Sequence, residues 1–158
     1  MKFLIAVALM ASTQAAPAQQ QAHLLKSAHS LRCVFDSGWT AILDSTRQWR
    51  LKPEQPTNPE APLIIEQLDR QHGRARMIDP ESGGSDVAMP RQEGQLSFVL
   101  VGLGAVTVTT VYDHYAPKTD PTERELFAVQ TVQGDLFPFG VHSTPFLSTW
   151  YGHCRVVQ

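Results

Sequence analysis

Residues 95–112, QLSFVLVGLGAVTVTTVY, carry the clearest strand pattern in the chain. Its first half alternates the apolar residues Leu96, Phe98 and Leu100 with Gln95, Ser97 and Val99. Gly102-Leu103-Gly104 then turns the chain, and one face of the return strand carries Val106, Val108, Thr110 and Tyr112. A two-residue period marks strands that have one face on a core. The stretch therefore predicts an antiparallel β-hairpin.

Strand-like runs recur on both sides of this hairpin, roughly every 8–12 residues, with turn signals between them. They are Leu31–Phe35, Trp39–Leu43, Gln48–Leu51, Leu63–Leu68, Ala75–Ile78, Asp86–Met89, Leu126–Val132, Leu136–Val141 and Trp150–Val157. No βαβ alternation appears, so the pattern does not indicate a nucleotide-binding α/β fold. It predicts an all-β fold, an antiparallel meander that closes into a small barrel, with a β-sandwich as the alternative.

The N-terminus has the three parts of a secretory signal peptide. Lys2 precedes an apolar run, and the small residues Ala16-Pro17-Ala18 follow it. We expect cleavage after Ala18, which makes residues 1–18 the signal peptide and the mature protein periplasmic or secreted. No apolar run reaches the roughly 20 residues that span a bilayer, so no transmembrane segment is expected.

The two cysteines, Cys33 and Cys154, are expected to form one disulfide that joins the two ends of the mature chain. Thiols of exported proteins rarely stay reduced. The chain-entropy model gives about 4.9 kcal/mol for closing a loop of this length. Two free thiols, or a cysteine that binds a metal, are the alternatives.

The rest of the mature chain is expected to form one domain. Residues 19–30 are polar and Gln-rich and form either a flexible segment or a short helix. Residues 31–158 form the β domain. Within it, prolines recur every third residue from Pro53 to Pro62, which predicts a Pro-rich loop over residues 52–62, because proline cannot join the interior of a sheet.

The charge of the mature chain speaks against nucleic-acid partners. Loss of Lys2 leaves 12 basic residues against 15 acidic ones. Binders of nucleic acids or anionic membranes usually carry a basic surplus. We expect a monomer without a nucleic-acid partner, whose partner is a ligand or an envelope protein.

No motif commits the chain to a reaction or to a cofactor. Gly-x-Ser-x-Gly is absent, as is a complete dinucleotide fingerprint. The histidines lack the spacing that would set two metal ligands on one element, so no metal site is expected. The enzymatic alternative is an exported hydrolase with a site near Asp113, His114, His142 and Ser143.

Four aromatic residues near Pro-interrupted segments are candidates for a binding rim. Phe137, Phe139, Phe146 and Trp150 lie where proline weakens regular strand pairing. Some of these rings are expected at a barrel mouth, and ordinary core packing is the alternative.

Several short motifs resemble, in their order, a group of small secreted proteins of proteobacteria without a known activity. The motifs are Arg32–Phe35, Ala75–Ile78, Asp86-Val87, Leu96–Phe98, Thr109–Val111 and Trp150–Cys154. The group ends in a Tyr-x-Gly-x-Cys-like pattern, whereas this chain has the tighter Tyr151-Gly152-His153-Cys154. The resemblance implies an exported all-β domain and carries no activity. We therefore expect a non-catalytic β-barrel module that binds a ligand or a protein partner.

Overall fold

A computed structural model describes residues 24–44, 46–56, 61–90, 92–102, 104–115, 125–135 and 144–157. Within these residues the chain forms one helical turn, residues 24–27, and nine strands. The strands are β1 (Ser30–Leu43), β2 (Trp49–Glu54), β3 (Leu63–Asp69), β4 (Arg74–Asp79), β5 (Gly83–Ala88), β6 (Gln95–Gly102), β7 (Ala105–Tyr115), β8 (Leu126–Asp135) and β9 (Pro145–Val157).

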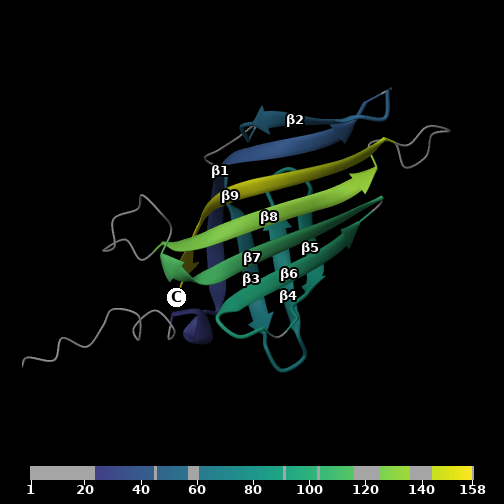
Figure 1. The fold of residues 1–158 in the computed structure, drawn as a ribbon. Helices are drawn as coiled ribbons and strands as arrows, with labels where there is room; N and C mark the ends of the chain where they lie inside the picture. Colours follow the sequence, from purple (N-terminus) through teal and green to yellow (C-terminus); the bar gives the residue numbers. More distant parts are fainter. Residues whose placement is uncertain are drawn as a thin grey trace, which may run out of the picture.

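The strands form a closed antiparallel barrel, as the spacing of the strand-like runs predicted (Figure 1). Neighbours follow the chain from β3 to β9, and β1 pairs with both β3 and β9. Closure leaves β2 as the extra strand outside the barrel. The barrel prediction is confirmed over the sandwich alternative.

The predicted disulfide is also confirmed. Cys33 and Cys154 are cross-strand partners on β1 and β9, and both are fully buried. The bond therefore lies inside the barrel, at the seam where the first barrel strand meets the last. No helix in the described part of the chain is long and apolar enough to cross a membrane.

Strand β1 is continuous and includes both predicted runs, Leu31–Phe35 and Trp39–Leu43, with no turn between them. A β-bulge between Phe35 and Ser37 bends the strand instead. Before the bulge β1 pairs with β3, and after it the same edge pairs with β2. At this bend Gly152 of β9 approaches β1 so closely that a Cβ there would lie 2.0 Å from the carbonyl oxygen of Val34.

The bend carries β1, β9, β8 and β7 beyond the barrel, where β2 joins them as an edge strand (Figure 1). Strand β2 includes Pro53, which corrects the start of the predicted loop over residues 52–62. In an antiparallel ladder, residue pairs that exchange backbone hydrogen bonds alternate with pairs that do not. The amide of Asp44 donates to the carbonyl of Gln48 (2.9 Å), so counting along the ladder makes Trp39–Pro53 a pair without such bonds. In that alternation the nitrogen of Pro53 faces the free edge, where no donor is needed.

The β6–β7 hairpin is confirmed, but the inward face of β7 is not the one with most valines. Leu96 pairs with Val111, and Phe98 pairs with Thr109. Partners in a ladder share a face, so Val111 and Thr109 are fully buried while Val106 is exposed.

The helical turn closes one end of the barrel, which we call the base. Leu25 and Ala28 are buried and belong to the core. Arg70, just after β3, donates hydrogen bonds to the carbonyls of Leu25 (2.5 Å) and Ala28 (2.9 Å). These bonds satisfy carbonyls that a helix end otherwise leaves without partners.

Candidate functional site

A cavity lies at the base, and we call it the basal pocket. Its volume is about 780 Å³. The helical turn, the β3–β4 turn, the β5–β6 connection and the end of β7 all contribute to it. Its apolar lining comes from Leu25, Met89, Pro90 and Leu96.

Charged side chains of both signs also line the basal pocket. The cations are Lys26 and Arg70, and the acids are Glu93 and Asp113. Oδ1 of Asp113 is fully buried. An apolar lining with a few charged groups is the usual composition of a small-molecule site, for which volumes of roughly 300–1,000 Å³ are typical.

Of the four residues proposed for a hydrolase site, one has a described side chain. Asp113 lies in the basal pocket. The side chain of His114 and the whole of His142 and Ser143 lie outside the described parts, so the hydrolase constellation stays a prediction. The other lining residues come from distant segments, and no local sequence signal marks them as one site.

The predicted aromatic rim is described at two of its four positions. Phe137 and Phe139 lie outside the described residues. Phe146 and Trp150 pair with Ile42 and Gly38 of β1. Residues four positions apart on a strand lie on the same face, so these two rings share a face and lie about 13 Å apart. Trp150 also lines a second pocket at the other end of the barrel.

A buried carboxylate lies on the outside of the barrel near its base. Nε of Arg155 donates to Oε1 of Glu125 at 2.5 Å, and Nε2 of His153 lies 3.6 Å from the same oxygen. The Glu125 side chain is only 5% exposed, so the guanidinium compensates a charge largely removed from water. Among the described residues, no three His, Cys, Asp or Glu side chains are grouped so as to hold a metal ion.

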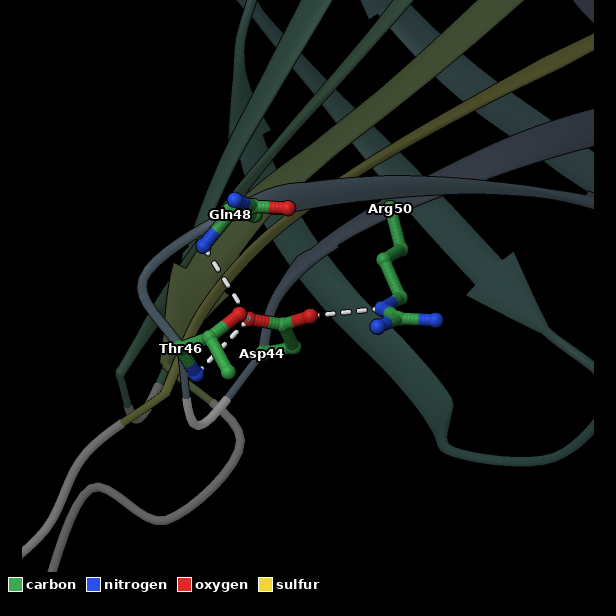
Figure 2. Close-up of polar contacts among 4 residues, drawn as sticks. All are labelled: Asp44, Thr46, Gln48 and Arg50. Carbon is green, nitrogen blue, oxygen red and sulfur yellow. Dashed lines mark hydrogen bonds and ion pairs between the residues drawn. The ribbon is translucent and has the colours of Figure 1, made fainter.

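A second polar cluster shapes the β1–β2 turn (Figure 2). Oδ1 of Asp44 accepts hydrogen bonds from the amide of Thr46 (2.8 Å), its hydroxyl (2.6 Å) and the amide of Gln48 (3.0 Å). Oδ2 accepts from Nε of Arg50 at 2.5 Å. These bonds, above all those from the Thr46 hydroxyl and Arg50, hold the pKa of Asp44 well below its usual range. These hydrogen bonds stabilise the turn, and this structural role accounts for the cluster without a ligand.

A hydroxyl chain joins β2 to the long strands. The Thr40 hydroxyl donates to Glu54 at 2.6 Å and lies 2.6 Å from the Ser148 hydroxyl. Because Thr40 has one proton to donate, Ser148 donates to Thr40. No histidine in the described part of the chain takes part in these bonds.

The outer face of the extended strands is apolar and exposed. Its large side chains on β2, β1 and β9 are Trp49, Leu51, Trp39, Leu147 and Tyr151. Leu51 is 72% exposed and Trp49 is 57% exposed. The alternation in these strands predicts two faces, but the sequence alone does not show that the face with both tryptophans lies outward.

The sequence matches no protein-family model and no curated protein. The resemblance to small secreted proteins of proteobacteria therefore stays a prediction.

Proposed function

We propose that this protein is an exported, non-catalytic β-barrel that binds a small amphipathic molecule in the basal pocket. The observation that carries the proposal is the pocket itself, a cavity of about 780 Å³ with an apolar lining and charged groups of both signs. A ligand with an apolar body would contact Leu25, Met89 and Leu96. Its polar group would lie among Lys26, Arg70, Glu93 and Asp113.

Export is supported by the tripartite N-terminus and by the disulfide, because such bonds persist in oxidising compartments. The non-catalytic assignment is supported by the sequence, in which no motif commits the chain to a reaction.

The basal pocket can be tested with 8-anilinonaphthalene-1-sulfonate, a fluorescent probe with an apolar body and one anionic group. We expect saturable binding to the folded mature chain. Lys26→Glu should weaken this binding about five-fold, because reversing the charge changes its interaction energy with the anionic group of the probe by a total of roughly 1 kcal/mol in a largely aqueous setting.

Lys52→Glu is the matched control, since Lys52 is an exposed lysine on β2, away from the base. It should leave the affinity for the probe unchanged. Absence of saturable binding, or an equal loss in both variants, would contradict the proposal.

A further inference from the structure

The second pocket, which we call the mouth pocket, lies at the end of the barrel opposite the base. Its volume is about 200 Å³. Phe35 of β1, Gln130 of β8 and Trp150 of β9 line one side. The end of β4 and the turn after it, with Asp79 and Glu81, line the other.

The aromatic wall of the mouth pocket is held in place. Trp150 lies against Gly38, its partner on β1, so closely that a Cβ at Gly38 would be 2.5 Å from Cε3 of the indole. On the other side of Trp150, Gln130 is its ladder partner and donates to the hydroxyl of Thr109 at 3.1 Å. Thr109 is fully buried. The indole and the amide are therefore positioned before any ligand arrives.

The acidic wall is fixed by its own turn. Oδ1 of Asp79 accepts hydrogen bonds from the amides of Glu81 (2.9 Å) and Ser82 (2.8 Å) and from the Ser82 hydroxyl (3.1 Å). These bonds hold the Asp79 carboxylate in its turn, and Glu81 follows two residues later. Both acidic residues line the same small pocket as Phe35 and Trp150.

The charge of the mouth pocket has one sign. Among the described lining residues, Asp79 and Glu81 carry charge, and none is a lysine, arginine or histidine. The basal pocket, in contrast, carries both signs. An anion would be repelled here, and the described residues offer no group of three ligands for a metal ion.

We propose that the mouth pocket binds an organic ammonium ion, with its cationic group over the face of Trp150 and beside the carboxylates of Asp79 and Glu81. The faces of aromatic rings attract cations, and tryptophan does so most strongly. Carboxylates add the charge that selects a cation over a neutral molecule of the same shape. The volume suits a headgroup such as trimethylammonium. This site is separate from the basal pocket, so either proposal can fail without the other.

Choline and 3,3-dimethylbutan-1-ol are the probes, because they share a shape and differ in charge. Each is titrated into the ¹⁵N-labelled mature protein. The indole N–H of Trp150 and the amides of Phe35 and Glu81 report binding. We expect saturable shifts with choline and at least ten-fold weaker binding of the neutral alcohol. Equal responses to both probes, or shifts confined to the base, would overturn the proposal.

Two matched pairs of variants locate the site. Trp150→Leu should weaken choline binding at least five-fold, whereas Trp39→Leu, on the opposite face of β1 and β9, should not change it. Glu81→Gln should weaken it about three-fold, whereas Glu93→Gln, in the basal pocket, should not.

If Trp150→Leu does not fold, as judged by the dispersion of its ¹⁵N spectrum, the Glu81→Gln pair and the two probes still decide the question. Competition separates this site from the proposed function: choline should not displace 8-anilinonaphthalene-1-sulfonate from the base. A Glu81→Gln variant that binds choline as well as the parent would refute the assignment.

Discussion

The indole of Trp150 lies against the backbone of Gly38, with Cε3 where a side chain on Gly38 would begin. A Cβ at Gly38 would be 2.5 Å from Cε3 and 2.8 Å from Cδ2 of the ring. These two residues are direct partners across the β1–β9 seam. The glycine therefore sets the position of the aromatic wall of the mouth pocket.

Gly38→Ala should lower the free energy of unfolding by about 1–3 kcal/mol, the usual cost of overpacking a filled site. The added methyl group must displace the indole or part the two strands. Urea denaturation measures the effect, and choline binding should weaken with it. Gly102→Ala is the control, because nothing lies within 4 Å of a Cβ at Gly102. Equal stability of the two variants would show that Trp150 does not occupy this position.

Loss of the disulfide should cost about 2–5 kcal/mol, the range for a native bond in a small secreted domain. Cys33 and Cys154 are fully buried and join strands that the chain separates by 121 residues. The double variant Cys33→Ala/Cys154→Ala should therefore unfold at a lower urea concentration than the parent. Dithiothreitol should shift the parent in the same direction and leave the double variant unchanged. A parent insensitive to reductant would contradict this account.

Stability should depend on Asp44 in a pH-dependent way. The hydrogen bond from the Thr46 hydroxyl, then that from Arg50, lowers the pKa of Asp44 in the folded state. In the unfolded chain an aspartate has a pKa of about 3.9, so between the two values the unfolded state binds more protons. The stabilisation is therefore complete above about pH 5 and is lost as the pH falls below about 4.

Asp44→Asn should thus be less stable than the parent at pH 7, and the difference should shrink as the pH is lowered from 5 to 2. Urea midpoints across this range provide the measurement. Asp86→Asn, at an exposed position on β5, is the matched control for the loss of one carboxylate. A difference between Asp44→Asn and the parent that does not change with pH would argue against an ionised Asp44 in the turn.

Export should leave a mature chain that starts near Gln19. The prediction rests on the charged start, the apolar run and the small residues that end at Ala18. N-terminal sequencing of protein recovered from the periplasm or the medium tests it. Recovery of soluble cytoplasmic protein that retains Met1 would refute it.

The local sequence was enough to predict most of the described strands, the hairpin and the disulfide, whereas the predicted strand Leu136–Val141 lies outside the described residues. The alternation of Leu96, Phe98 and Leu100 is a local property of the chain, and it survives in β6 as an inward face. The disulfide could be predicted because the chain is expected to be exported and has only two cysteines, which allow a single intramolecular pairing. Barrel closure was preferred because it removes free sheet edges.

The tertiary structure decided which faces point inward and which residues form the pockets. The valines of β7 looked like its core face, yet the pairing of Phe98 with Thr109 turned the opposite face inward. The runs Leu31–Phe35 and Trp39–Leu43 were predicted as separate strands, yet pairing with β9 makes them one continuous strand with a bulge. The first outcome depends on the register of the hairpin, and the second depends on a partner strand far away in the chain; the local alternation specifies neither. The two pockets have the same origin: Leu25 meets Asp113, and Phe35 meets Trp150, only because the sheet closes.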